Sequence, residues 1–320
     1  MKKNRGIITV VFAALILIGI YYFELPGSKA NDSSSSGTAI KLLDVSAEEI
    51  TEVEIDNRNE KLVFSKDMDK WKLTYPSGIK YDQVITDGLH LSLGYIEANK
   101  EVARNKTDLS PYGLDKPVSI SVKSRDGKVK ILEIGSITSS KEDYYARIRG
   151  SDRIYTVPAE KAEAILLTKN RVKDKNVLAL AEYKKVAVRG DDIKSIILER
   201  HGEKVFKAGR DSDGNWNETF PQENEIDASK LDSVLNAITR ATALEFVDED
   251  TDLSKYGLDK PSYGIEFEYA VDNKVLRKKL YIGDENKPDC EFFARVEGSK
   301  DVFILDETGF DFLDKNWNGV

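Results

Sequence analysis

Few residues of this sequence have types and spacings that would support catalysis. The chain has two histidines, His90 and His201, and neither lies near a partner motif for a catalytic triad or a zinc site. Carboxylates are plentiful, and glycoside cleavage needs only two of them. We therefore predict no catalytic residues and no cofactor, and a carboxylate-dependent hydrolase is the alternative.

One segment has the composition of a calcium-binding loop. Residues 211–218 read DSDGNWNE and offer oxygen ligands at alternate positions. A calcium loop needs glycine at its sixth position and glutamate at its twelfth, whereas here Gly214 is fourth and Gln222 is twelfth. Because Asp, Asn and Gly are also preferred in turns, the segment predicts a hairpin turn and no metal site.

Two arginines occupy the same place in two similar segments. Arg147 lies in YARI at residues 145–148, and Arg295 lies in FARV at residues 293–296. Each could pair with a buried carboxylate or bind an anionic ligand, because a guanidinium group suits both roles. The ion pair is the favoured interpretation, and both arginines are kept as candidate binding residues.

The longest internal repeat marks two copies of one folding unit. Residues 107–117 read TDLSPYGLDKP, and residues 251–261 read TDLSKYGLDKP, with a single difference. The candidate structural or binding residues of this repeat are Tyr112, Gly113, Leu114, Asp115, Lys116, Pro117, Tyr256, Gly257, Leu258, Asp259, Lys260 and Pro261.

The repeat is typical of a short helical turn that ends at glycine. Asp108 can cap the turn, and Gly113 can take the left-handed conformation that glycine adopts without strain. Leu109 and Leu114 then occupy the two positions that touch in a Schellman motif. We favour a structural role for the repeat, and the alternative is a binding patch formed by its Tyr, Asp and Lys residues.

The N-terminal segment is typical of a membrane anchor. An uncharged, apolar run covers residues 6–23 and follows Lys2, Lys3 and Arg5. As a helix the run would span about 27 Å, close to the thickness of the hydrocarbon core of a bilayer. The basic residues before it predict a single-pass protein of the cytoplasmic membrane, with its N-terminus inside and the bulk of the chain extracytoplasmic. A signal peptide cleaved after Ala30 is the alternative.

The net charge argues against one class of partner, and the cysteine content excludes an intramolecular disulfide. The formal net charge is −8, and Lys2, Lys3 and Arg5 contribute +3, so the remaining chain carries −11. This acidic balance argues against nucleic-acid binding, which needs a basic face. Cys290 is the only cysteine, so no intramolecular disulfide forms, and we interpret it as a small apolar residue of a strand.

Hydrophobic periodicity predicts a similar order of strands and helices in both copies. In the first copy, strands are expected at residues 50–55, 61–64, 71–75, 118–122, 128–134, 144–148 and 153–157, and helices at 81–98 and 158–167. In the second copy, strands are expected at residues 193–198, 204–206, from 216 onward, 264–270, 275–282, 291–296 and 301–305. Asp227 is expected to cap the longer helix of this copy, and Asp306 a last short helix.

These patterns predict an α+β fold, in which an N-terminal transmembrane helix precedes two tandem copies of a unit built from an antiparallel sheet and helices. The expected organisation is a cytoplasmic tail at residues 1–5, a transmembrane signal-anchor at 6–23, a flexible linker at 24–39, a first repeat unit at 40–182 and a second at 183–320. The two repeat units are called the first copy and the second copy below.

The combination of these features resembles the domain-of-unknown-function family 4340. The resemblance rests on the anchor, the LSxYGLDKP turn, the YARI strand and the DKN sequence at residues 174–176, which recurs at 314–316. It covers residues 40–316 and implies a bacterial envelope protein of a kind often associated with ABC-type export systems. The family has no established activity, so no catalytic residues are carried over from it.

Three functional hypotheses follow. The favoured one is a membrane-tethered, extracytoplasmic, non-enzymatic module that acts as an accessory subunit of an ABC-type transporter or envelope assembly. The alternatives are a carboxylate-dependent cell-envelope hydrolase and a module that binds a ligand in the crease between the two copies. The last hypothesis requires Arg147 or Arg295 to face that crease.

Overall fold

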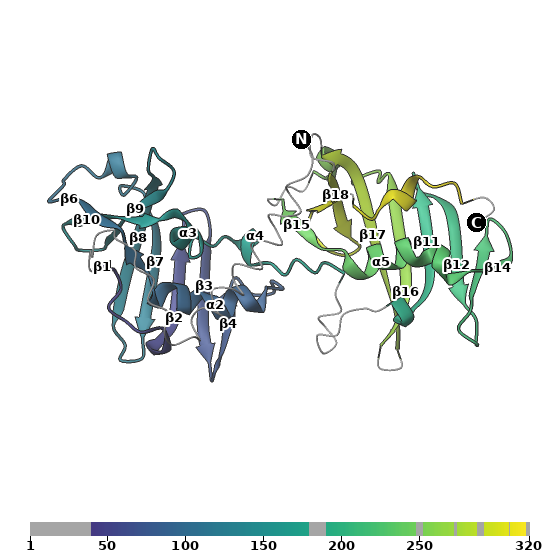
Figure 1. The fold of residues 1–320 in the computed structure, drawn as a ribbon, viewed down its shortest axis with the longest axis horizontal. Helices are drawn as coiled ribbons and strands as arrows, with labels where there is room; N and C mark the ends of the chain where they lie inside the picture. Colours follow the sequence, from purple (N-terminus) through teal and green to yellow (C-terminus); the bar gives the residue numbers. More distant parts are fainter. Residues whose placement is uncertain are drawn as a thin grey trace, which may run out of the picture. The chain divides into compact units, whose positions relative to one another are not determined.

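The computed structural model describes residues 40–178, 190–247, 252–271, 274–286, 291–306 and 308–317. Within these ranges, no helix is long and apolar enough to cross a membrane. The predicted anchor, the linker after it and Cys290 lie outside the described residues. Figure 1 shows the first copy in purple to teal and the second copy in green to yellow.

The first copy forms an eight-stranded antiparallel sheet in the order β4-β3-β2-β7-β8-β9-β10-β6. Its strands are β2 (Ile50–Asp56), β3 (Lys61–Asp67), β4 (Lys70–Tyr75), β6 (Lys100–Arg104), β7 (Val118–Ser124), β8 (Val129–Ile137), β9 (Asp143–Ile148) and β10 (Arg153–Pro158). A separate two-stranded sheet joins β1 (Ile40–Lys41) to β5 (Glu97–Ala98). The antiparallel pairing confirms the predicted sheet type.

The helix α2 (Gln83–Gly94) lies across one face of this sheet (Figure 1). Asp82 caps it, because its carboxylate accepts a hydrogen bond from the backbone N–H of Val84 at 2.8 Å. Its inward face buries Leu89 and Leu93. The helix is shorter than the predicted 81–98 because the chain after it becomes extended as β5 and pairs with β1.

The second copy forms a nine-stranded antiparallel sheet in the order β14-β13-β12-β11-β16-β17-β18-β19-β15. Apart from β14, this is the order of the first copy, strand for strand. Its strands are β11 (Ile193–Arg200), β12 (Glu203–Arg210), β13 (Trp216–Phe220), β14 (Asn224–Ile226), β15 (Ala243–Phe246), β16 (Tyr263–Val271), β17 (Lys274–Asn286), β18 (Glu291–Val296) and β19 (Phe303–Asp306). The helix α5 (Asp232–Arg240) takes the place of α2 in the chain order.

Each sheet has a hydrophobic core of its own. Trp71 in the first core and Trp216 in the second are each 2 % exposed, and Phe64 and Phe206 on the neighbouring strands are fully buried. In the second core, Trp317 packs on Phe206 with ring centroids 4.4 Å apart. Burial of such large aromatic side chains is a dominant source of stability in a core.

Two predicted helix starts need correction. Pro158 is the N-cap of α3 (Ala159–Glu163) and not its first helical residue, because it is still the last residue of β10. The helix is therefore shorter than the predicted 158–167, and a further helix, α4 (Lys169–Val172), follows it. Asp306 caps no helix, because it accepts a hydrogen bond from the backbone of Thr308 within a turn.

The remaining helical segments of the second copy are 3-10 turns. Asp227 caps η4 (Ala228–Leu231) by accepting a hydrogen bond from the backbone of Ser229 at 2.9 Å, and α5 follows directly. The last helical segment is η6 (Asp311–Asp314), which buries Phe312 and Leu313 against the second core.

Candidate functional site

The repeated turn of the first copy closes as the sequence predicts. The 3-10 helix η2 (Ser110–Tyr112) ends at Gly113, which has a left-handed φ of 64°. The backbone N–H of Leu114 donates to the carbonyl of Leu109 at 3.2 Å, which is the bond that defines a Schellman motif. The N-cap of η2 is Leu109 and not the predicted Asp108. The carboxylate of Asp108, one residue earlier, still accepts a hydrogen bond from the backbone N–H of Ser110 at 3.0 Å.

The turn of the second copy closes in the same way. The 3-10 helix η5 (Leu253–Tyr256) ends at Gly257, which has a φ of 63°. Leu258 donates its backbone N–H to the carbonyl of Leu253 at 2.9 Å. Asp252 caps the turn through the backbone N–H of Ser254 at 3.2 Å. The two turns are therefore the same local structure, formed twice.

A second glycine in each copy lets the turn lie directly on the sheet. A Cβ atom added to Gly135 in β8 would overlap the carbonyl oxygen of Tyr112. A Cβ atom added to Gly283 in β17 would overlap the carbonyl oxygen of Tyr256 in the same manner. Since backbone cannot move aside as a flexible side chain can, glycine is required at both positions.

The tyrosine of each repeat packs against an aromatic residue of the sheet, in β9 of the first copy and in β18 of the second. The rings of Tyr112 and Tyr145 meet edge to face at 5.2 Å, and those of Tyr256 and Phe293 lie 5.0 Å apart. The leucines after the glycines, Leu114 and Leu258, are buried. The other polar residues of the two repeats are exposed and the prolines are half-buried: Asp115, Lys116, Pro117, Asp259, Lys260 and Pro261.

Arg147 pairs with a buried carboxylate in the first copy. Its Nε donates to Glu133 at 2.5 Å, and the Nε of Arg149 donates to the other carboxylate oxygen at 2.7 Å. Arg149 also donates to the hydroxyl of Ser119 at 2.9 Å. Because Glu133 is only 3 % exposed, the two guanidinium groups offset the cost of burying its charge. The sequence signal for Glu133 is an acidic residue between the apolar residues Leu132 and Ile134 of β8.

Arg295 has a different environment in the second copy. Glu133 lies opposite Arg147 in the first sheet, and Tyr281 lies opposite Arg295 in the second. The guanidinium of Arg295 lies over the ring of Tyr281 at 5.6 Å, and its Nε is buried without a hydrogen-bond partner. Arg295 therefore makes a cation–π contact where Arg147 makes an ion pair.

An ion pair between buried Lys279 and half-buried Glu199 lies beside Tyr281 in the second copy. Lys279 is 9 % exposed and donates to both carboxylate oxygens of Glu199, at 2.7 and 2.6 Å. Glu199 and Tyr281 line an open hollow of about 450 Å³, together with Lys260 and Pro261 of the repeat. This hollow is one place where residues of the second repeat border a concave surface.

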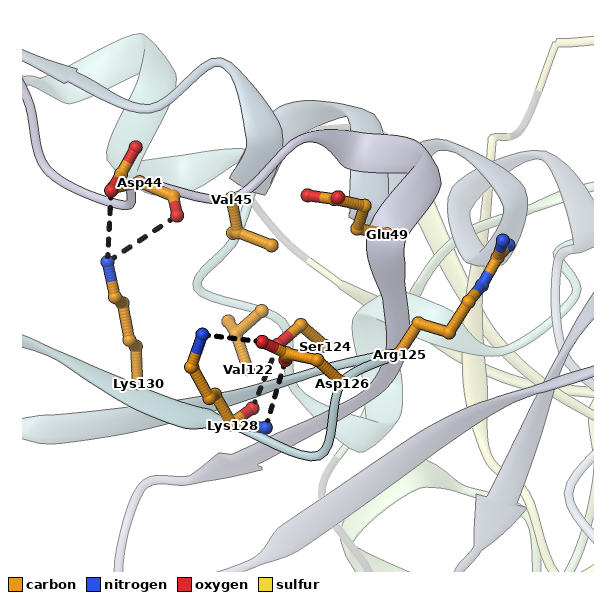
Figure 2. Close-up of a pocket in the computed structure, with 9 residues that line it drawn as sticks. All are labelled: Asp44, Val45, Glu49, Val122, Ser124, Arg125, Asp126, Lys128 and Lys130. Carbon is orange, nitrogen blue, oxygen red and sulfur yellow. Dashed lines mark hydrogen bonds and ion pairs between the residues drawn. The ribbon is translucent and has the colours of Figure 1, made fainter.

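A second hollow, of about 520 Å³, opens at the β7–β8 hairpin of the first copy (Figure 2). Three of its residues are acidic, Asp44, Glu49 and Asp126, and three are basic, Arg125, Lys128 and Lys130. Lys128 Nζ lies 2.7 Å from a carboxylate oxygen of Asp126, and the Ser124 hydroxyl donates to the same side chain at 2.5 Å.

These contacts set the protonation of Asp126. The hydrogen bond from the Lys128 side chain and the one from Ser124 hold the pKa of Asp126 well below its usual range. Asp126 is therefore ionised at neutral pH and cannot supply a proton. The carboxylates of Glu101 and Glu266 are likewise shifted downward in pKa, chiefly by hydrogen bonds from Arg104 and Arg277.

The other residues considered for chemistry do not converge. His90 stacks on Trp71 with ring centroids 5.2 Å apart, and burial lowers its pKa. His201 lies at the turn after β11. Asp211 accepts a hydrogen bond from the backbone of Asn215 at 2.9 Å in the turn between β12 and β13. The predicted hairpin turn at this segment is confirmed.

Comparison with known proteins places both copies in one family. A family model described as a domain of unknown function (DUF4340) matches residues 71–261 and residues 247–320. No curated protein and no solved structure matches the chain. The family match agrees with the resemblance inferred from the repeated turn and the YARI strand. The chain belongs to the DUF4340 family.

Proposed function

We propose that this protein is a membrane-tethered, extracytoplasmic, non-enzymatic module that serves as an accessory subunit of an ABC-type transporter or envelope assembly. The observation that carries the proposal is the apolar run at residues 6–23, preceded by Lys2, Lys3 and Arg5. A chain anchored in this way presents both sheets to partners on the extracytoplasmic side of the cytoplasmic membrane.

The geometry of the shared motifs supports a module over an enzyme. The two repeated turns use their glycines and leucines to dock on the sheets, and Arg147 is held by Glu133 within the chain. Glycoside cleavage needs one carboxylic acid whose pKa is raised, so that it can donate a proton. The described carboxylates whose pKa departs from the usual range are all shifted downward: Glu48, Glu101, Asp108, Asp126, Asp211, Asp227 and Glu266.

The test is to crosslink the full-length chain in native membranes and to identify the polypeptides that co-purify with it. Recovery of a transporter permease or ATPase in stoichiometric amount is the expected result. Recovery of the protein alone, from membranes where the crosslinker does join a known complex, would overturn the proposal. A chain in which residues 6–23 are replaced by a cleavable signal peptide is the control for anchoring, and it should lose the partner.

A further inference from the structure

The helix α2 presents a line of apolar residues to solvent. Val84, Leu91 and the C-cap residue Tyr95 are 80, 46 and 58 % exposed. Gly88 lies between them, and the spacing 84, 88, 91 and 95 places all four on one face of a helix. We call these four residues the α2 outer face.

The opposite face of α2 already supplies the apolar residues that pack against the sheet. Thr86, Leu89 and Leu93 of the same helix are buried against the sheet. The outer face therefore contributes nothing to the core of the first copy. A single exposed apolar side chain is an ordinary feature of a protein surface. Three of them in a line along one helix indicate a surface for association.

Gly88 provides a second, independent observation. A Cβ atom added at this position would meet nothing within 4 Å, and its φ does not lie in the left-handed region. Glycine inside a helix lowers stability relative to alanine, and no described residue lies close enough to this position to require it. A small residue between two apolar ones does allow the backbone of a second helix to approach closely.

The second copy shows that the fold does not demand such a face. The equivalent helix α5 buries Val234, Ala237 and Ile238 on its inward side. Its exposed residues are polar or charged: Asp232, Ser233, Asn236 and Arg240. The same position in the same architecture is thus polar in one copy and apolar in the other.

We infer that the α2 outer face docks an apolar helical surface of an integral membrane subunit. This inference rests on the proposed function, because it requires the chain to be anchored. The described chain begins at Ile40 in β1, which pairs with β5 immediately after α2. The described fold therefore begins beside the end of α2, and the predicted linker at residues 24–39 precedes this point in the sequence.

The predicted linker would limit the distance between this face and the bilayer. If residues 24–39 form the flexible tether that their composition predicts, their sixteen residues have a root-mean-square span of about 22 Å. The anchored chain would then hold the α2 outer face within reach of the extracytoplasmic ends of neighbouring membrane helices.

Charge selects a protein partner over a lipid surface. The only charged residue of α2 is Asp87, and the helix has no lysine or arginine. Helices that lie on anionic bilayers carry basic residues on their polar face. Exposed Asp87 lies one turn from Val84 and Leu91, at the edge of the α2 outer face. The face therefore fits an apolar helix that has small residues at the contact and no acidic residue opposite Asp87.

Photocrosslinking tests the contact in the anchored, full-length protein. With p-benzoylphenylalanine in place of Leu91, we expect an adduct with an integral membrane polypeptide that is identified by its peptides. The matched control carries the same group in place of Asn236 on α5 and should give no such adduct. An adduct of Leu91→p-benzoylphenylalanine with lipid, or with a second copy of this chain, would overturn the inference.

A set of variants separates this inference from the proposed function. The triple variant Val84→Gln, Leu91→Gln and Tyr95→Gln should reduce the recovery of the membrane subunit at least tenfold, while its thermal unfolding temperature stays close to that of the wild type. The control Ser233→Gln, Asn236→Gln and Arg240→Gln should leave recovery unchanged. Full recovery with the α2 variant would contradict the inference and leave the proposed function standing. A wild-type chain without any subunit would contradict both.

Discussion

The two sheets share their strand order, but they differ in the residue that lies opposite an arginine on the face away from the core. Across from the arginine of β9 the first copy has Glu133, whereas across from the arginine of β18 the second has Tyr281. The residue beside it on the neighbouring strand is Ser119 in the first copy and Gly264 in the second. The turn that docks on each sheet is nevertheless the same, down to its left-handed glycine.

This comparison separates what the fold requires from what each copy is free to change. The glycines of the turn and of the strand below it recur because backbone atoms meet there. The contacts of the two arginines are made by side chains of their own sheets, so an ion-pair cluster in one copy can be replaced by an aromatic contact in the other. Differences between the copies are therefore the more informative guide to function.

The largest effect is expected from truncating the central tryptophan of either core. Trp216→Ala should destabilise the second copy by about 4 kcal/mol, and Trp71→Ala should do the same to the first, because each removes a fully buried aromatic side chain. Hydrogen exchange measured by mass spectrometry shows which copy has lost protection in each variant. Equal loss of protection in both copies from either single variant would show that the two cores unfold as one unit.

The glycines under the repeated turns come next. Gly135→Ala and Gly283→Ala should each cost about 3 kcal/mol of unfolding free energy, because the new Cβ overlaps a backbone carbonyl. Denaturant unfolding is the measurement, and Gly88→Ala is the control. That change meets no neighbour and should stabilise α2 by about 0.5–1 kcal/mol. Similar tolerance of all three substitutions would contradict the docking of the turns.

Removing one polar group at the position opposite the arginine should lower the unfolding free energy by different amounts in the two copies. Glu133→Gln leaves Arg147 and Arg149 without their shared carboxylate and should cost about 2 kcal/mol, since the partners are partly exposed. Tyr281→Phe removes one hydrogen bond to Glu297 and should cost about 0.5–1 kcal/mol. A larger cost for the tyrosine than for the glutamate would reverse the comparison.

The smallest effect concerns pH. Burial and a hydrogen bond to Asp314 raise the pKa of Tyr263 to about 12, above its ordinary value of 10.0. The protonated form is thus favoured by folding, so its contribution is fully present below pH 10 and is lost as the pH rises through about 12. The first copy has Val118 at this register position, which does not titrate. Unfolding monitored between pH 10 and 12 should show a steeper loss in the wild type than in Tyr263→Phe.

Much of the fold can be predicted from the sequence because most strands alternate buried and exposed residues. In β2 and β3, for example, the apolar positions that alternate with polar ones in the sequence face the core. The turn is equally predictable, because Gly113 and its flanking leucines admit few other conformations. Strand β6 escapes prediction because it is an edge strand that buries none of its residues. Its exposed and half-buried positions alternate, but its sequence KEVAR does not alternate between polar and apolar residues.

The candidate sites are harder to foresee from sequence alone. The two equivalent arginines are visible in the sequence, but their partners depend on which residue of β8 or β17 lies opposite, and that register is a property of the assembled sheet. The outer face of α2 is hidden for a related reason. Its apolar residues follow the same helical spacing as the buried ones, and only the packed sheet shows which side is covered.

The order of strands in each sheet also governs how the chain can assemble during synthesis. Among the described strands, β6 pairs only with β10 and β15 pairs only with β19. Each of these edge strands can therefore pair only after a partner has been made, about fifty residues later for β6 and about sixty residues later for β15. The first sheet has all its strands once Pro158 has been made, before any strand of the second sheet exists. The nascent chain can therefore fold one sheet at a time, and an edge strand is the last piece that each sheet receives.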